Sequence, residues 1–307
     1  MTNIFIDGSA GTTGLRIYDR LSTRDDISLI KLPEELCKDD NARADAINSA
    51  DIVFLCLPDD AARQAVSFVK NENTAIIDTS TAHRTNDGWV YGFPELTGKR
   101  EQIATSKRIA NPGCHASGFI ALVKPLIEAG VLSAKTALSC FSLTGYSGGG
   151  KKMIADYEDP NKSALLKAPR QYGLTQQHKH LKEMQIISGI ETVPAFCPIV
   201  ADFYSGMEVT VTLFKQDIKA NIDDIKAIYK NYYTGKLVHF DDAADEGGFL
   251  SAAALSGKDD MQISIFGNED RIILTARYDN LGKGASGAAI QNMNILMGVD
   301  ETIGLVF

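Results

Sequence analysis

The first third of the chain alternates short apolar runs with stretches of helical spacing. The apolar runs lie at 2–7, 27–32, 51–58 and 74–78, and the helical stretches at 15–21 and 59–68. The run at 51–58 is almost continuously apolar, which is typical of a parallel strand buried on both faces. Regular alternation of strands and helices predicts an α/β fold, a Rossmann-type parallel sheet that is doubly wound by helices.

The pattern changes after residue 114. Residues 136–144 have the composition of a strand, and residues 208–214 alternate with period two, which predicts a half-exposed antiparallel strand. Residues 262–267 and 271–277 are separated by Asn-Glu-Asp and predict a hairpin, while 221–232 predict a helix. This middle region is therefore expected to be α+β.

A last helix is predicted at 287–298, after a glycine-rich loop, and we expect it to return to the first domain. The sequence thus suggests two domains. Residues 1–113 with 282–307 would bind a dinucleotide, and residues 114–281 would carry catalysis, substrate binding and oligomerisation.

Composition and charge exclude several classes of function. The chain has 307 residues and a net charge of −8, which argues against nucleic-acid binding because that needs a basic face. No apolar stretch approaches the roughly 20 residues that span a bilayer, and the N-terminal strand leaves no room for a signal peptide. Five cysteines at irregular spacing predict neither a disulfide framework nor a metal site. We expect a cytoplasmic protein without a metal.

Glycines recur at the first strand–helix junction with the spacing GxxGxxG. A first glycine permits a tight turn, a second lets the backbone approach a pyrophosphate, and a third allows close helix packing. Glu34 and Glu35 follow the second strand at a distance that suits NAD, whereas the nearby Lys31 favours the 2′-phosphate of NADP. The residues expected to bind the cofactor here are Gly8, Ser9, Gly11, Thr12, Thr13 and Gly14.

Cys114 is the candidate nucleophile. Pro112 and Gly113 break the preceding strand, and the apolar run 119–123 after it predicts a helix. The cysteine is therefore expected at a helix N-terminus, where free N–H groups and the helix dipole favour a thiolate. The alternative is a small buried cysteine at a tight turn, and the dinucleotide-type N-terminus argues against it.

Taken together, these segments resemble the N-acetyl-gamma-glutamyl-phosphate reductases in their shorter form, which are related to the aspartate-semialdehyde dehydrogenases. Two departures from the family pattern are His115, where the longer form usually has tyrosine, and Lys182, where a proline is usual. The resemblance extends through most of the chain. It rests on Gly8–Gly14, Tyr91–Leu96, Asn111–Cys114, Gly145–Gly150, His178–Glu183, Asp279–Gly287 and Gln291–Asn294.

The resemblance implies reductive dephosphorylation of an acyl phosphate with NADP(H). Cys114 would form a thioester and expel phosphate, and hydride transfer would give the semialdehyde. His180 is implied as the general acid/base, with His178 as the competitor. Glu183 lies one helical turn after His180 and is expected to orient an imidazole or to contact substrate. His115 is expected to act from behind the nucleophile, because neighbouring side chains point apart.

Further contacts are expected around the substrate and the nicotinamide. Arg84 follows a strand's carboxyl end, where open α/β sheets bind ligands, and a guanidinium suits a carboxylate or phosphate. Lys151 and Lys152 follow a flexible glycine run and are a second choice of cation, and Gln291 is a second choice beside the nicotinamide. The other residues implied are Asn111 and Ser147 for the substrate, and Gly148 and Asn292 for the cofactor.

Rival interpretations remain at this point. An aspartate-semialdehyde dehydrogenase shares the fold, the cofactor and the cysteine chemistry, and pocket shape separates the two substrates. A phosphorylating aldehyde dehydrogenase of the glyceraldehyde-3-phosphate type is more remote. A non-catalytic dinucleotide sensor would keep the glycine loop and need no thiolate. The period-two strands predict a sheet surface for a homodimer or homotetramer.

Overall fold

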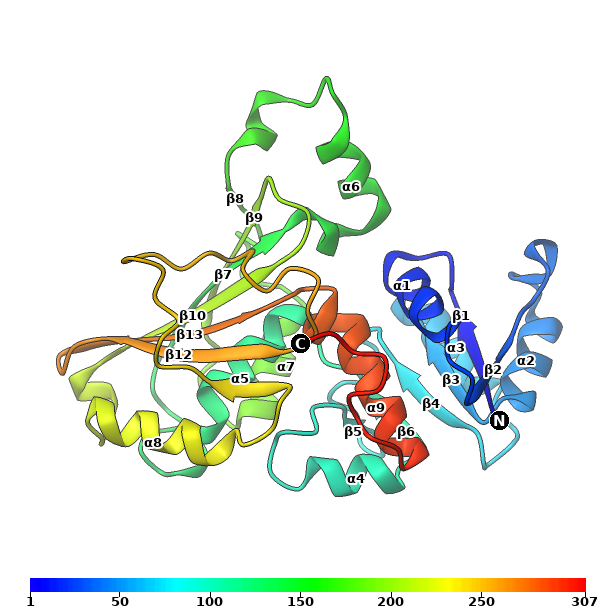
Figure 1. Cartoon of the computed structure of the whole chain (residues 1–307), viewed down its shortest axis with the longest axis horizontal. Helices are drawn as coiled ribbons and strands as arrows, with labels where there is room; N and C mark the ends of the chain where they lie inside the picture. Colours follow the sequence, from blue (N-terminus) through cyan, green and yellow to red (C-terminus); the bar gives the residue numbers. More distant parts are fainter. The chain divides into compact units, whose positions relative to one another are not determined.

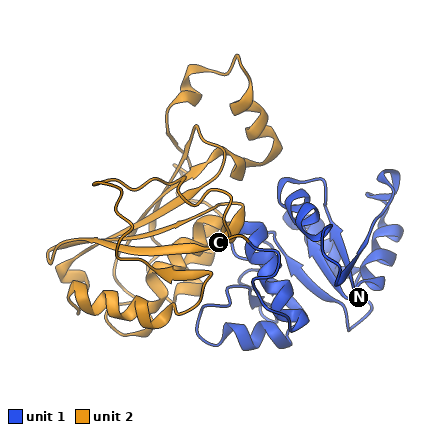
Figure 2. Cartoon of the chain, viewed as in Figure 1, with its two compact units in different colours: residues 1–113, 285–305 blue, residues 114–284, 306–307 orange.

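The computed structural model describes all 307 residues and divides them into two units (Figure 2). Unit 1 comprises residues 1–113 and 285–305, and unit 2 comprises 114–284 with 306–307. The change of unit at 113/114 is the one expected from the sequence. At the other end, residues 282–284 and the last two residues fall in unit 2, so the chain returns to unit 1 slightly later than expected.

Unit 1 is built on a six-stranded sheet in which every neighbouring pair is parallel (Figure 1). The strand order is β2-β1-β3-β4-β6-β5. Successive strands are therefore added on one side of β1 and then, from β3 onward, on its other side, as in a doubly wound sheet. The strands are β1 (Thr2–Asp7), β2 (Ile27–Ile30), β3 (Ile52–Leu55), β4 (Ala75–Asp78), β5 (Val90–Tyr91) and β6 (Arg108–Ala110). The helices are α1 (Thr12–Leu21), α2 (Asp40–Ser49), α3 (Asp59–Ser67), α4 (Lys99–Thr105) and α9 (Gly287–Met297).

Each face of this sheet has its own apolar core. Ile4 and Ile6 of β1 point to one face, where they pack with residues of α1, α4 and α9. Phe5 points to the opposite face and packs with residues of α2 and α3. Successive side chains of a strand alternate between the faces, so a continuously apolar strand such as β3 is buried on both. The doubly wound sheet predicted from the sequence is confirmed.

The C-terminal helix α9 completes unit 1. Ala289, Ile290 and Met293 are fully buried among residues of the first sheet face, far from them in sequence. Arg24 of the N-terminal segment donates a hydrogen bond to Asn294 Oδ1 at 2.5 Å. The expected return of the last helix to the first part of the chain is therefore observed.

Unit 2 is built on a seven-stranded mixed sheet of order β11-β12-β13-β10-β7-β9-β8 (Figure 1). Helix α5 packs against β10 and β13 and against two further helices, α7 and α8. The strands are β7 (Ser139–Gly145), β8 (Arg170–Gln171), β9 (Ala195–Ala201), β10 (Met207–Phe214), β11 (Val238–Phe240), β12 (Met261–Gly267) and β13 (Arg271–Tyr278). The helices are α5 (Cys114–Glu128), α6 (Gly150–Glu158), α7 (His180–Ser188) and α8 (Ile222–Tyr232).

The period-two segment forms β10, which pairs antiparallel with both β7 and β13. The hairpin β12–β13 is also observed, and Asn221 caps α8 by accepting a hydrogen bond from the Asp224 N–H. The α+β character expected of this region is confirmed. No helix of the protein combines the length and the apolar character that crossing a membrane requires.

We expect unit 1 to depend on α9. Replacing Ile290 by alanine removes a fully buried side chain and should lower the free energy of unfolding by about 3 kcal/mol, because the cavity left behind cannot fully collapse. Urea unfolding of the variant measures this. Ile303→Ala, at a side chain that is 40% exposed, is the control, and equal losses in both variants would contradict the role of α9.

Candidate active site

The glycine loop between β1 and α1 is shaped by close backbone contacts. Gly8 has a φ of +86°, and a β-carbon there would collide with the carbonyl oxygen of Cys56. A β-carbon on Gly14 would collide with the carbonyl oxygen of Gly8. Gly11 donates a hydrogen bond to the carbonyl of Gly8 and occupies the N-cap position of α1, where it supplies no side-chain cap. The loop therefore presents the uncapped N-terminus of α1, the arrangement that binds phosphate groups.

A cavity of about 610 Å³ lies beside this loop. Gly8 and Ser9 of the loop line it, and so do Lys31 and Lys38. The Lys31 ammonium lies 4.9 Å from the centre of the Tyr18 ring, which also lines the cavity. Glu34 and Glu35 form a short exposed 3₁₀ helix outside the lining. The charged residues that line the cavity are Lys31, Lys38, Arg43, Asp7 and Asp40, so the cations outnumber the carboxylates by one.

A buried ion pair lies at the end of β1, next to the cavity. Arg43 of α2 donates to both carboxylate oxygens of Asp7, with a closest distance of 2.9 Å, and both side chains are buried. Burial raises the pKa of Asp7, and the Arg43 guanidinium opposes that shift. Both residues also line the cavity. The pair was not anticipated, because its members lie 36 residues apart.

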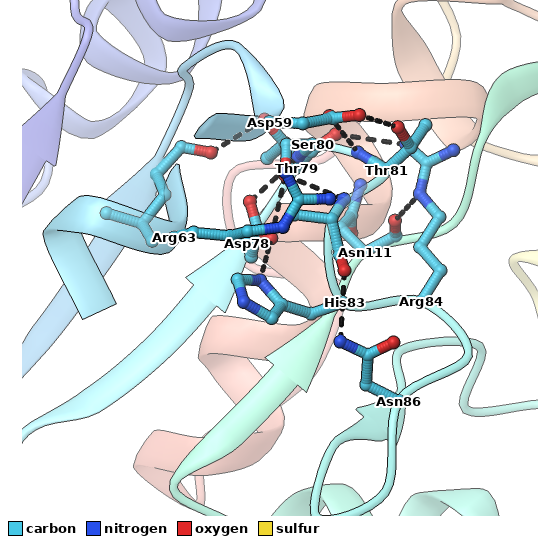
Figure 3. Close-up of polar contacts among 12 residues, drawn as sticks. Asp59, Arg63, Asp78, Thr79, Ser80, Thr81, His83, Arg84, Asn86 and Asn111 are labelled. Carbon is cyan, nitrogen blue, oxygen red and sulfur yellow. Dashed lines mark hydrogen bonds and ion pairs between the residues drawn. The ribbon is translucent and has the colours of Figure 1, made fainter. Parts of the chain in front are cut away.

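The loop after β4 is held by two carboxylates (Figure 3). Asp78 accepts hydrogen bonds from the backbone and hydroxyl of Ser80, and its other contact is His83 Nδ1 at 2.6 Å. The His83 ring stacks on Trp89. Asp59, at the start of α3, accepts two hydrogen bonds from Thr81. These bonds fix the loop that carries Arg84.

Arg84 is buried and its guanidinium binds backbone oxygen atoms. Nε donates to the carbonyl of Asn111 at 2.9 Å, and one terminal nitrogen donates to the carbonyl of Thr79 at 3.0 Å (Figure 3). The Asn111 side chain in turn donates to the carbonyl of Ala285. Arg84 thereby braces the segment that ends β6 and leads to Cys114.

Asn292 and Gln291 lie side by side in sequence on α9 but have different surroundings. The Asn292 amide donates to the carbonyl of Gly92 at 2.9 Å and to Asn111 Oδ1 at 3.2 Å. Its own carbonyl oxygen is buried and has no hydrogen-bond partner. Gln291 donates to the carboxylates of Glu95 and Glu301. The side-chain oxygen of Asn292 is thus an unused hydrogen-bond acceptor.

Cys114 is the first residue of α5, as the sequence predicted. Tyr278 of β13 donates from its hydroxyl to the Cys114 carbonyl at 2.5 Å and accepts from the Gly118 N–H at 3.0 Å. A β-carbon on Gly284 would lie 3.1 Å from the Cys114 β-carbon, so the glycine keeps space at the nucleophile. Burial, chiefly, and the charge of Cys114 raise the pKa of the Tyr278 phenol.

His115 lies at the centre of a ring cluster in unit 2. Its Nδ1 is 2.6 Å from the Ser142 hydroxyl, and its Nε2 is 2.7 Å from the Tyr172 hydroxyl. Burial lowers its pKa to about 3, with a smaller contribution from His178. The imidazole is therefore neutral near pH 7.

His178 and His180 belong to the same cluster. Their ring centres are 4.7 Å apart, and each lies within 6 Å of the His115 ring. His180 begins α7 and is buried, and Glu183 is buried in the same turn. Burial and the charge of Lys179 lower the pKa of His178, against an opposing effect of Glu183. The three residues expected from the sequence thus lie together with His115.

Ser147 and Gly148 lie in a separate 3₁₀ segment (146–149) of unit 2. The Ser147 hydroxyl accepts a hydrogen bond from the Asn280 amide, and its N–H donates to the carbonyl of Tyr204. Lys151 and Lys152 are exposed in the first turn of α6. The Ser147 N–H is therefore already used within the chain.

Unit 2 thus combines a cysteine at a helix N-terminus with a cluster of histidines, which suits nucleophilic and acid/base chemistry. The sequence did not single out Ser142, Tyr172 or Tyr278. Neither spacing nor residue type marks them, since each is brought to the site by a different part of the sheet or its loops.

Comparison with known proteins relates both units to one family. Residues 12–106 match the NAD-binding domain of semialdehyde dehydrogenases, and residues 114–280 match their dimerisation domain. The first match begins inside the glycine loop, at Thr12, and the second begins at Cys114.

Similar proteins extend over nearly the whole chain. A protein of Nostoc sp. named N-acetyl-gamma-glutamyl-phosphate reductase 2 is 45% identical, with 98% of each chain covered. A Brucella suis protein named N-acetyl-gamma-glutamyl-phosphate reductase is 46% identical and covers 96% of this chain and 98% of its own. The fold resembles aspartate semialdehyde dehydrogenase II of Vibrio cholerae, with TM-score 0.72, 16% identity and coverage of 97% and 98%. It also resembles the Candida albicans aspartate semialdehyde dehydrogenase, solved with NADP, with TM-score 0.69, 15% identity and coverage of 99% and 100%.

The neutral, buried His115 predicts a loss of stability in acid. An unfolded imidazole takes up its proton near the ordinary pKa of 6.5, whereas the folded one does so only near 3. Stability conferred by this group is therefore present above pH 6.5 and falls as the pH drops through that window. Urea unfolding between about pH 7 and pH 5 should show a smaller acid-induced loss in His115→Asn than in the wild type. His239→Asn, at a partly exposed ring, should retain the wild-type loss, and identical slopes in all three proteins would contradict the assignment.

Proposed function

We propose a function for this chain on the premise that it belongs to the semialdehyde dehydrogenase family. The proposed reaction is the NADP-dependent reductive dephosphorylation of N-acetyl-gamma-glutamyl phosphate to N-acetylglutamate semialdehyde, a step of arginine biosynthesis. The observation that carries it is Cys114 at the start of α5, in the same unit as the His178–His180 pair. The names of the relatives that are 45–46% identical supply the substrate.

In the first half of the reaction, the Cys114 thiolate attacks the acyl carbon of the substrate. A carbon–sulfur bond forms, the carbon–oxygen bond to phosphate breaks, and phosphate leaves, so the acyl group is held as a thioester. The helix dipole at the start of α5 favours both the thiolate and the oxyanion that develops on the acyl oxygen. The Tyr278 hydroxyl holds the backbone of Cys114 during the step.

In the second half, NADPH supplies a hydride to the thioester carbon when it is bound. The oxyanion then re-forms the carbonyl, the carbon–sulfur bond breaks, and Cys114 leaves as the thiolate. We assign His180 as the group that protonates this oxyanion after hydride transfer and takes the same proton back as the carbonyl re-forms, because it begins α7 and has Glu183 in the same turn. His178, whose pKa is lowered by burial, is the competing assignment. Glu183 orients an imidazole or contacts the substrate.

The residues of unit 1 fit a dinucleotide. Gly8 and Gly14 leave a cradle that a β-carbon would fill, and the adjoining cavity is large enough for the adenosine half. Lys31 and Lys38, which line the cavity, support a 2′-phosphate, so NADP is the cofactor we propose. The unpartnered carbonyl oxygen of Asn292 is an acceptor for the nicotinamide carboxamide. The loop residues Ser9, Gly11, Thr12 and Thr13 complete the phosphate site, and Gly148 remains a proposed contact.

Besides Glu183, the residues expected to contact the substrate are Arg84, Asn111 and Ser147. The bonds of Arg84 to the carbonyls of Thr79 and Asn111 support a positioning role for it, which holds the segment before Cys114 in place. Asn111 and Ser147 remain proposed substrate neighbours. We further propose a cytoplasmic homodimer or homotetramer, because the second family match is a dimerisation domain and all five cysteines are free thiols.

Two other functions give different outcomes. An aspartate-semialdehyde dehydrogenase would use the same cysteine on a shorter substrate without an acetyl group. A dinucleotide sensor would bind cofactor without turnover. Phosphate-dependent reduction of NADP⁺ with N-acetylglutamate semialdehyde, and none with aspartate semialdehyde, is the result we expect. Activity with aspartate semialdehyde alone would replace the substrate, and cofactor binding without turnover would favour the sensor.

Cys114→Ser should lower turnover by several orders of magnitude and keep cofactor affinity, because a hydroxyl is far less ionised than a thiol. Cys197→Ser, at a half-buried thiol of the same unit, is the matched control and should keep wild-type activity. Turnover and NADPH binding by fluorescence are measured for both. Undiminished turnover in Cys114→Ser would rule out the covalent mechanism.

Lys31→Ala should raise the KM for NADPH roughly tenfold, or about 1.4 kcal/mol, and leave the KM for NADH nearly unchanged. The reason is that only NADPH carries the 2′-phosphate that the ammonium would contact. Lys107→Ala, at an exposed lysine outside the cavity, is the control. Equal changes for both cofactors would contradict the assignment of Lys31.

A further inference from the structure

Three side chains from distant parts of unit 2 are joined by hydrogen bonds through His115, the residue that follows the nucleophile. The hydroxyl of Ser142, on β7, is 2.6 Å from Nδ1 of His115, and Nε2 of His115 is 2.7 Å from the hydroxyl of Tyr172. Ser142 is fully buried and His115 is 3% exposed. Tyr172, on the loop between β8 and α7, is the only one of the three that is partly exposed.

The direction of these hydrogen bonds follows from the lack of a second acceptor for the buried Ser142 hydroxyl. His115 is neutral near pH 7, so one ring nitrogen donates and the other accepts. The Ser142 hydroxyl is buried, and its partner is His115 Nδ1. If Nδ1 carried the proton, the Ser142 proton would be left without an acceptor, at a cost of about 1–3 kcal/mol. Ser142 therefore donates to Nδ1, and the ring proton is on Nε2.

This tautomer of His115 determines how the Tyr172 hydroxyl, at the exposed end of the three hydrogen-bonded side chains, can bond. With its proton on Nε2, His115 donates to the Tyr172 oxygen, and the phenolic proton of Tyr172 is left available for another acceptor. Tyr172 lies close enough to Cys114 for the charge of the thiolate to raise the pKa of the phenol, together with a larger effect of burial. The Tyr172 ring also contacts the His115 and His178 rings. The donor thus lies in the proposed active site.

We propose that Tyr172 is a further catalytic residue, whose hydroxyl, oriented by Ser142 through His115, donates a hydrogen bond to the Cys114 thiolate. The inference rests on the proposed function in that it assigns Cys114 as the nucleophile. Ser142 and His115 are positioning residues, since they act through Tyr172. A hydrogen bond from a neutral phenol stabilises the thiolate in the resting enzyme and is again available when the thiolate is released.

Several other groups lie near the Cys114 backbone or in the same ring cluster, and they set the background for a test. Tyr278 holds the Cys114 backbone, and the start of α5 supplies its dipole. Glu183 and the His178–His180 pair lie in the same cluster, and Lys179 adds a positive charge beside His178. None of these is changed when only the Tyr172 hydroxyl is removed.

The experiment is the pH dependence of Cys114 alkylation by iodoacetamide in the full-length protein, followed by mass spectrometry of the Cys114 peptide. This readout needs neither substrate nor cofactor, so it is independent of the proposed reaction. Tyr172→Phe should raise the pH midpoint by about one unit, which corresponds to the loss of one hydrogen bond to a charged group. Ser142→Ala should shift it in the same direction by less, because it only releases the His115 tautomer.

Tyr232→Phe is the matched control, since its hydroxyl binds the exposed side of Glu128 in the same unit, and it should keep the wild-type midpoint. An unchanged midpoint in a folded Tyr172→Phe protein would overturn the proposal. Long-range ¹H–¹⁵N NMR of the wild type gives a second test that needs no variant. A proton on His115 Nε2 supports the proposal, and a proton on Nδ1 overturns it.

Failure of the proposed function looks different. If the wild type showed no phosphate-dependent turnover while Tyr172→Phe still shifted the alkylation midpoint, the reaction would be wrong and the hydrogen bond right. If turnover were present and the midpoint did not move, the reaction would stand without this role of Tyr172.

Discussion

The site depends on how few residues separate β6 from α5. β6 ends at Ala110 and α5 begins at Cys114, so the backbone must turn from strand to helix within three residues. The carbonyl of Asn111 is held by Arg84, and the carbonyl of Cys114 is held by Tyr278. A cysteine at the first position of a helix has its sulfur near the positive end of the helix dipole, so the reactivity of the thiol follows from the path of the backbone.

Features that depend on local sequence could be predicted. The glycine loop was recognisable because Gly8 and Gly14 lie where any β-carbon meets a backbone carbonyl. The start of α5 was recognisable from Pro112 and Gly113, and β10 from its period-two pattern. In each case a few consecutive residues determine the conformation, so the sequence carries the signal by itself.

Features that depend on distant partners could not be predicted. His115 meets Ser142 and Tyr172, which are 27 and 57 residues away, and no spacing rule connects them. The Asp7–Arg43 pair is hidden for the same reason. Arg84 illustrates a related difficulty. Its position after a strand suggested a ligand, but its guanidinium binds the carbonyl of Thr79 in its own loop and the carbonyl of Asn111 after the neighbouring strand β6.

The insertion of unit 2 within the sequence of unit 1 has a consequence for synthesis. β6 and the strands before it leave the ribosome long before α9, whose Ile290 and Met293 fill the core on one sheet face. At 5–20 residues per second, that apolar face waits on the order of 10 to 40 s for its last helix. During this interval the nascent first domain exposes an apolar surface. Its need for chaperones therefore follows from the order in which its segments are synthesised, and not from the stability of the folded protein.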